Sequence, residues 1–203
     1  MSKVKVLGVS GSPRKGRNTD SLLRAALEAA AELDAETEHV TIADLRIQPC
    51  DGCNACARGK PCPLDADDDM EALRERLTEA DAVIFAAPSY FGAVPGVMKN
   101  MMDRSRPLKM EGHRLGGKVV SALSLSGLRH GGAEQVAEAI VRFGLIHDMI
   151  VVGGCGDPLT EGHFAVASLQ GDEGWRRAEE DAVAVANARA VGRRVAEVAL
   201  ALR

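Results

Sequence analysis

The chain has 203 residues and a mass of 21.4 kDa, and 46% of its residues are apolar. This length and apolar fraction predict one folded domain over 1–203 and exclude a wholly disordered chain. With 25 basic and 29 acidic side chains, the net charge is −4 and the sequence pI is about 5.8. That balance excludes the basic surface of a nucleic-acid-binding protein, so the expected partners are small molecules or other proteins.

The first residues carry charges every few positions and lack the apolar core of a secretory signal. The longest uncharged stretch, 82–98, is interrupted by proline and glycine and is short for a bilayer. We therefore expect a cytoplasmic protein that does not enter a membrane.

Short apolar segments alternate with amphipathic ones, which is the pattern of strands and helices in a parallel sheet. The expected strands are 4–9, 38–42, 82–87, 118–124 and 150–152, and the expected helices are 21–33, 70–80, 94–104, 133–144 and 178–202. Asn18 or Thr19 is expected to cap the first helix. A glycine-rich loop is expected between the last strand and Trp175. This order predicts a doubly wound sheet, which binds ligands where loops leave the carboxyl ends of its strands.

The first loop with a binding pattern is SGSPRKGRNT at 10–19, between a strand and a helix. Backbone N–H groups at a helix N-terminus carry partial positive charge, so such a loop can hold a phosphate. Gly11 and Gly16 have the spacing of a nucleoside-triphosphate loop, but Arg17 and Asn18 stand where that motif has Lys and then Ser or Thr. A polar surface turn is the alternative.

Two later loops follow the next strands of the predicted sheet. In PSYFG, Tyr90 and Phe91 come directly after the most apolar strand, where a flat ligand can pack, although they could also simply close the end of the core. The third loop, SLSGLRHGG at 124–132, has small residues that let the backbone approach a ligand closely. Its His130 is expected to be solvated and not catalytic.

Together SGSPRKGRNT, PSYFG and the following MKNMMDR resemble the flavodoxin-like flavin reductase family over nearly the whole chain. The resemblance implies a five-stranded parallel sheet of order 2-1-3-4-5 with helices on both faces, and bound flavin mononucleotide (FMN). It implies that the first loop binds the FMN phosphate through Ser10, Ser12, Arg14, Asn18 and Thr19. It implies that the second and third loops contact the isoalloxazine ring through Pro88, Ser89, Tyr90, Phe91, Gly92, Ser124, Leu125, Ser126 and Gly127. The third loop departs from many members, which have Gln where this chain has Ala133.

Four of the five cysteines, Cys50, Cys53, Cys56 and Cys62, lie in a loop at about 49–66 with the spacing C-x2-C-x2-C-x5-C. Three cysteines with two residues between each neighbouring pair can hold three corners of an iron–sulfur cubane, and a fourth cysteine nearby can hold the remaining corner. A zinc ion on four thiolates, or metal-free thiols that form a switchable disulfide, are the alternatives. Cys155 stands apart and is expected to be a small buried residue.

This cysteine spacing beside the flavin loops resembles the iron–sulfur flavoproteins, a branch of the same superfamily. The resemblance implies a homodimer or homotetramer with one [4Fe–4S] cluster and one FMN per subunit, and a ferredoxin-like one-electron donor. The predicted function is electron transfer from that donor through the cluster to FMN and on to a small-molecule acceptor, with the chemistry carried by the cofactors. An NAD(P)H-dependent FMN or quinone reductase without a functional cluster and a cysteine-based redox sensor are the alternatives.

Overall fold

The computed structural model describes residues 3–154, 157 and 162–203. Its main sheet is parallel, with the order β2-β1-β3-β4-β5 and a sixth strand, β6, that also pairs with β4. The strands are β1 Lys5–Ser10, β2 Glu36–Thr41, β3 Ala82–Pro88, β4 Val119–Ser126, β5 Ile150–Val151 and β6 Ala165–Ser168. The predicted doubly wound sheet of order 2-1-3-4-5 is therefore confirmed.

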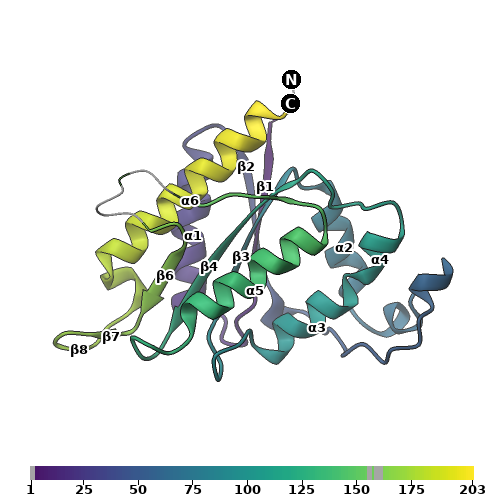
Figure 1. Cartoon of the computed structure of the whole chain (residues 1–203), viewed down its shortest axis with the longest axis horizontal. Coiled ribbons are helices and arrows are strands. Elements are labelled where there is room, and N and C mark those ends of the chain that lie inside the picture. The colour runs from purple at the N-terminus through teal and green to yellow at the C-terminus, as the bar shows by residue number, and fades with distance from the viewer. Residues whose placement is uncertain (1–2, 155–156, 158–161) are drawn as a thin grey trace.

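Helices cover both faces of the sheet (Figure 1). One face is covered by α1 Asn18–Ala31 and α6 Ala182–Ala201. The other face is covered by α2 Met70–Glu79, α3 Gly96–Arg104, α4 Arg106–Met110 and α5 Ala133–Ile146. Short 3-10 helices occupy Ile42–Asp44, Cys56–Arg58, Pro63–Asp67 and Ala178–Glu180. No helix in the described part of the chain is long and apolar enough to cross a membrane.

The central strand β3 shows why the sheet could be predicted from the sequence. All of its residues are buried, because helices cover both of its faces. Successive side chains of a strand point to opposite faces, and here Ile84 packs in the core under α1 and α6 while Val83 and Phe85 pack in the core under α2, α3 and α5. Such a strand appears in the sequence as a continuous apolar run.

Residues 162–175 differ from the expected glycine-rich loop. They form β6 and then a small antiparallel hairpin of β7 Gln170–Gly171 and β8 Gly174–Trp175. Strand β6 is only four residues long, and it is stabilised by pairing with Leu123–Ser126 of β4. That pairing is a tertiary contact, which local sequence patterns do not report.

The start of α1 also differs from the prediction. The helix begins at Asn18, its N-cap residue is Arg17, and no side chain caps it. The predicted capping role of Asn18 or Thr19 is therefore wrong. The side-chain oxygen of Asn18 instead accepts a hydrogen bond from the backbone N–H of Ala178, at 3.1 Å, so it ties α1 to the segment that precedes α6.

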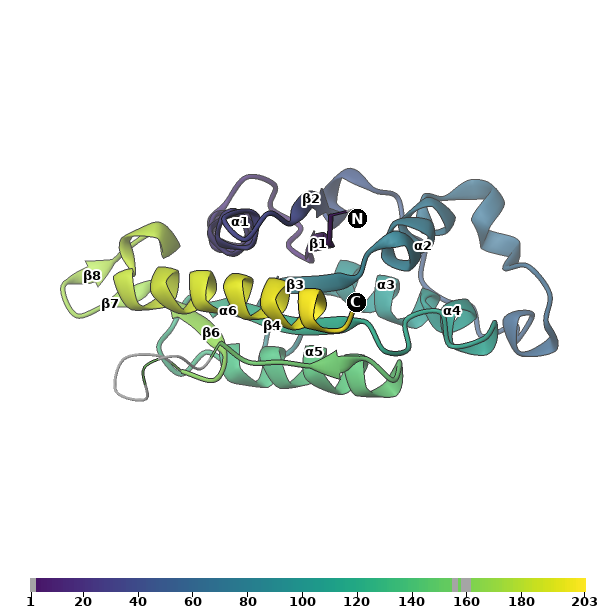
Figure 2. The ribbon, with the colours of Figure 1, turned by 90° about the horizontal axis from the view of Figure 1, so that it is seen from above.

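The cysteine loop at 49–66 lies outside the sheet. Figures 1 and 2 both show it at the end of the molecule beyond α4, opposite the β7–β8 hairpin. The sequence-based expectation for Cys155 concerns a position outside the described residues.

Candidate functional site

The three predicted binding loops meet at the carboxyl ends of β1, β3 and β4. The backbone N–H of Gly11 donates to the carbonyl oxygen of Ala86 at 2.7 Å, which joins the first loop to β3. Ser89 joins the second loop to the third twice, since its backbone N–H donates to Leu125 at 2.7 Å and its hydroxyl donates to the carbonyl oxygen of Gly131 at 2.5 Å. The three loops therefore form one hydrogen-bonded unit.

Two glycines allow these loops to pack closely. A Cβ atom on Gly11 would lie 2.6 Å from the sulfur of Met98, so the first loop packs directly on α3. Gly132 has φ +83°, and a Cβ atom there would lie 2.7 Å from the Cα atom of Gly92. A larger residue at Gly132 would push the second and third loops apart, and one at Gly11 would collide with Met98 of α3.

A cavity of about 210 Å³ opens between the three loops. Its lining residues come from all three loops and from the end of β6: Ser12, Arg14, Arg17, Asn18, Thr19, Pro88, Ser89, Tyr90, Leu125, Ser126, Gly127 and Leu169. Sequence reasoning missed Arg17 and Leu169 as lining residues. Leu169 could not be found, because it follows the strand that the sequence did not reveal.

Four of the predicted cofactor-binding residues do not line this cavity. Phe91 has φ +52° in a tight turn with Gly92, and its side chain is fully exposed to solvent. The hydroxyl of Ser124 donates to the carbonyl oxygen of Ala133 at 2.5 Å, so this side chain braces the third loop. Ser10 lies fully buried at the start of the first loop.

One end of the cavity has the features of a phosphate site. The N-terminus of the 14-residue helix α1 faces it through Asn18 and Thr19, and two arginines add positive charge. The nearly buried hydroxyl oxygen of Ser12 accepts a hydrogen bond from the backbone N–H of Arg14 at 3.1 Å, which fixes the turn. The hydroxyl of Ser10 is fully buried beneath the loop and faces the carboxylate of Asp20. This donor set fits the phosphate of FMN.

A buried acid, Asp20, lies at the base of the same loop. Its carboxylate accepts a hydrogen bond from the backbone N–H of Gly16, and the Nε2 atom of His39 lies 3.6 Å from its other oxygen. Burial raises the pKa of Asp20, but the hydrogen bonds with His39, Ser10 and Gly16 outweigh burial, so its pKa lies below the ordinary value of 3.8. Asp20 is therefore ionised at neutral pH and holds the loop. Sequence reasoning did not identify this role.

The other end of the cavity is lined by more apolar residues. Tyr90 lines it, held in a tight turn in which Tyr90 and Ala93 exchange backbone hydrogen bonds of 2.9 and 3.1 Å. Gly127 and Leu169 complete this end, and the exposed ring of Trp175 lies beside Gly127, 3.6 Å from the position a Cβ atom would take there. Aromatic and apolar walls of this kind suit a planar ring system.

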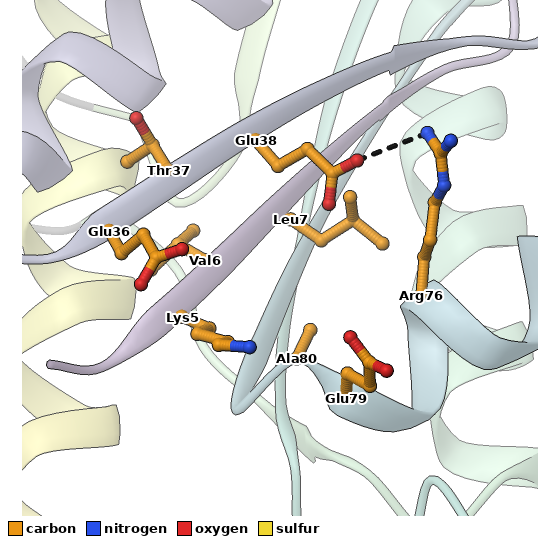
Figure 3. Close-up of a pocket in the computed structure, with 9 residues that line it drawn as sticks. All are labelled: Lys5, Val6, Leu7, Glu36, Thr37, Glu38, Arg76, Glu79 and Ala80. Carbon is orange, nitrogen blue, oxygen red and sulfur yellow. Dashed lines mark hydrogen bonds and ion pairs between the residues drawn. The ribbon is translucent and has the colours of Figure 1, made fainter. Parts of the chain in front are cut away.

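A second cavity, at the opposite edge of the sheet, does not belong to this site. Figure 3 shows it between the starts of β1 and β2 and the end of α2, with an ion pair of 3.0 Å between Arg76 and Glu38 at its rim. Its volume is about 60 Å³, which is less than a third of the 210 Å³ of the cavity between the three loops.

The cysteine loop presents four free thiols. Cys50 and Cys53 are exposed, whereas Cys56 and Cys62 are partly buried. Within the described residues, no three Cys, His, Asp or Glu side chains converge on a point that could hold a metal ion. The donors match a [4Fe–4S] cluster in number and chemistry, and the loop holds them in an open arrangement.

Positive backbone φ angles let the cysteine loop turn sharply. Gly52 and Gly59 have φ values of +73° and +66°, which glycine adopts without strain, and Asn54 has φ +58°. The guanidinium of Arg58 donates to the carbonyl oxygen of Cys53 at 3.0 Å across the turn. The loop thus has defined local structure.

Comparisons with known proteins agree with this geometry. The family model of the NADPH-dependent FMN reductases matches residues 4–156. An iron–sulfur flavoprotein of Archaeoglobus fulgidus is 39% identical over 200 residues, covering 98% of each chain. An iron–sulfur flavoprotein of Methanocaldococcus jannaschii is 41% identical over 195 residues, covering 96% of this chain and 97% of the relative.

A solved structure shows the same fold at low identity. The WrbA-like flavodoxin from Agrobacterium tumefaciens superposes with a TM-score of 0.63 at 19% identity, over 100% of both chains. The fold is therefore flavodoxin-like. With full-length relatives near 40% identity and a reductase domain over most of its length, the chain belongs to the iron–sulfur flavoprotein family of flavin-dependent oxidoreductases.

Proposed function

We propose that this protein passes electrons from a one-electron donor through a [4Fe–4S] cluster to FMN and on to a small-molecule acceptor. The observation that carries the proposal is that one chain has a three-loop cavity suited to FMN and, on a separate loop, four free thiols. When bound, the cluster would exchange single electrons while FMN holds one or two, so the pair links one-electron donors to two-electron acceptors.

The lining of the cavity supports a proposal for which loop binds which part of FMN. We propose that the phosphate binds at the first loop, through Ser12, Arg14, Asn18 and Thr19, with Arg17 as an additional contact, and that buried Ser10 supports this loop from below. The isoalloxazine ring would lie against 88–92 and 124–127, with Tyr90 as the aromatic wall. The residues position FMN, and they set its potential through hydrogen bonds and local charge.

The cluster would be held by Cys50, Cys53, Cys56 and Cys62. Thiols in such numbers stay reduced in the cytoplasm, where we place the protein. Because an exposed cluster needs protection from oxygen, we propose that subunits associate as a homodimer or homotetramer, and that the donor is a small ferredoxin-like protein.

A second function is favoured by the reductase family model over residues 4–156. An NAD(P)H-dependent FMN or quinone reductase would use the same flavin cavity and would not need the cysteine loop. The two functions differ in whether the thiols take part.

Replacing Cys53 by Ala separates these functions. The variant should lose cluster absorbance and electron transfer from a one-electron donor, while FMN, which is bound by other loops, stays in place. Cys155→Ala is the control and should change little. Full activity of Cys53→Ala with NADPH as donor would establish the plain reductase instead.

A further inference from the structure

Four charged side chains lie buried beneath the cysteine loop. They are Arg74 on α2, Arg104 on α3, Asp65 at the end of the cysteine loop and Asp68 just before α2, and we call them the arginine–aspartate cluster. Their side chains are 7%, 1%, 11% and 0% exposed, respectively. Charged groups are rarely this buried, because removing them from water is costly unless each one is paired.

Arg104 is the centre of this cluster. Its guanidinium donates to Asp68 at 2.6 and 3.2 Å and to Asp65 at 2.8 Å. Asp65 also pairs with Arg74, which donates to the backbone oxygen of Arg104 at 3.4 Å. Burial lowers the pKa of Arg104, but the hydrogen bonds from its guanidinium to Asp68 and Asp65 outweigh this and raise it. Arg104 is therefore a permanent cation at this position.

The same side chain reaches both ends of the cysteine loop. Arg104 donates to the backbone oxygen of Gln48 at 3.2 Å, and the backbone N–H of Gln48 donates to Asp68 at 3.0 Å. Gln48 comes two residues before Cys50, and Asp65 comes three residues after Cys62. The guanidinium thus connects the chain just before the first cysteine with the chain just after the last one.

Further hydrogen bonds hold the middle of the loop and the residue Ile47 before it. Arg106 of α4 donates to the side chain of Asn54 at 2.6 Å, and Asn100 of α3 donates to the backbone oxygen of Ile47 at 3.2 Å. A cavity of about 310 Å³ separates the loop from α2 and α4, and Cys62 lines it. The ends of the loop are therefore held by buried charged groups. Its middle packs on α4 through the turn Cys56–Arg58, and the cavity lies beside residues 59–65.

We propose that Arg104 is a positioning residue that fixes both ends of the cysteine loop before metal is bound. With its ends fixed, only the middle of the loop has to rearrange to gather the four thiols. A fixed loop also loses less chain entropy when it closes on a cluster than a free one does. This inference rests on the proposed function, because it assigns Arg104 to the assembly of the proposed cluster.

The test compares Arg104→Gln with a matched control. The control is Arg76→Gln on α2, whose ion pair with Glu38 is half-exposed (Figure 3). Metal-free proteins are digested with trypsin, and cleavage after Arg58 in the middle of the loop is timed. Each protein is then incubated anaerobically with ferrous iron and sulfide, and bound iron, sulfide and FMN are counted.

We expect at least tenfold faster cleavage after Arg58 in Arg104→Gln and less than half the iron of the wild type, with FMN content unchanged. Arg104→Lys should recover part of the iron, because an ammonium keeps the charge but not the planar fork of donors. Arg76→Gln should match the wild type. If Arg104 only supported the fold, Arg104→Gln would lower the FMN content together with the iron content. Arg104→Lys would then not restore the iron content.

Asp65→Asn is the second variant, in case Arg104→Gln fails to fold. It keeps the pair between Arg104 and Asp68, and it should change cleavage and iron uptake in the same direction by a smaller factor. Wild-type cleavage rate and iron content in a folded Arg104→Gln or Asp65→Asn protein would overturn the inference. If the wild type itself takes up no iron, the proposed function fails, and the cleavage rates alone decide whether Arg104 fixes the loop.

Discussion

The buried carboxylate of Asp20 accepts a hydrogen bond from the backbone N–H of Gly16, so the first turn of α1 holds the loop that precedes it. Asp20→Ala should free the loop and weaken FMN binding about tenfold, the effect of one hydrogen bond to a charged group. Asp20→Asn should retain most of the affinity, because its amide oxygen can still accept. FMN fluorescence titration of the flavin-free proteins measures both effects. Equal affinities for Asp20→Ala and the wild type would contradict the role of Asp20 in holding the loop.

Ser12 and Arg14 provide a stronger test of the phosphate end of the cavity. The double variant Ser12→Ala with Arg14→Ala should release flavin, because it removes a fixed turn and a charge-assisted contact, together worth about 2–5 kcal/mol. Circular dichroism should stay as in the wild type, since Arg14 is exposed. Flavin extracted from the wild type should be the mononucleotide. Full flavin content in the double variant, or a dinucleotide in the extract, would show that the loop is wrongly assigned.

His147 should make stability depend on pH. Its Nε2 atom lies 2.9 Å from the hydroxyl oxygen of Ser105, which donates its own hydrogen to Met102, so the imidazole donates here. Burial lowers the pKa of His147 below the ordinary 6.5, and the charge of Lys109 lowers it further. The unfolded chain therefore binds the proton first as pH falls. The stabilising contribution is complete above pH 6.5 and is lost below it, by at most about 1.4 kcal/mol per pH unit.

Urea denaturation from pH 8 to pH 5 measures this effect. The wild type should lose stability below pH 6.5, whereas His147→Gln should lose less over the same range. Identical pH profiles for the two proteins would contradict the assignment.

Strands and loops of the flavin site were predictable where helices cover both faces of the sheet. Continuous apolar runs such as 82–87 then mark the strands, and the polar loops after them mark the site. Strand β6 was not predictable, because its four residues depend on pairing with β4.

The aspartates before α2 show a second limit of sequence reasoning. Acids are common before a helix N-terminus, and Asp68 accepts a hydrogen bond from the backbone N–H of Met70 at 3.1 Å. Asp68 also binds Arg104, 36 residues further along the chain. No local pattern relates positions so far apart, so the arginine–aspartate cluster appears only once the chain is folded.

Trp175 provides an internal probe of the flavin cavity. It is the only tryptophan of the chain, it is exposed, and it lies beside Gly127 at the ring end of the cavity. FMN bound there should strongly quench its fluorescence, in proportion to the fraction of sites filled. Trp175→Phe should bind FMN with wild-type affinity and serves as the control for flavin fluorescence. Unchanged tryptophan emission at saturating FMN would place the flavin elsewhere.

The central claim is that one chain carries both FMN and a [4Fe–4S] cluster on Cys50, Cys53, Cys56 and Cys62. The most direct measurement is anaerobic purification from iron-replete cells, followed by analysis of iron, acid-labile sulfide and flavin. We expect about four iron and four sulfide, with one FMN, per subunit. Zinc, or free thiols without iron and sulfide, in protein that still binds FMN would contradict the claim and leave a flavin reductase without a cluster.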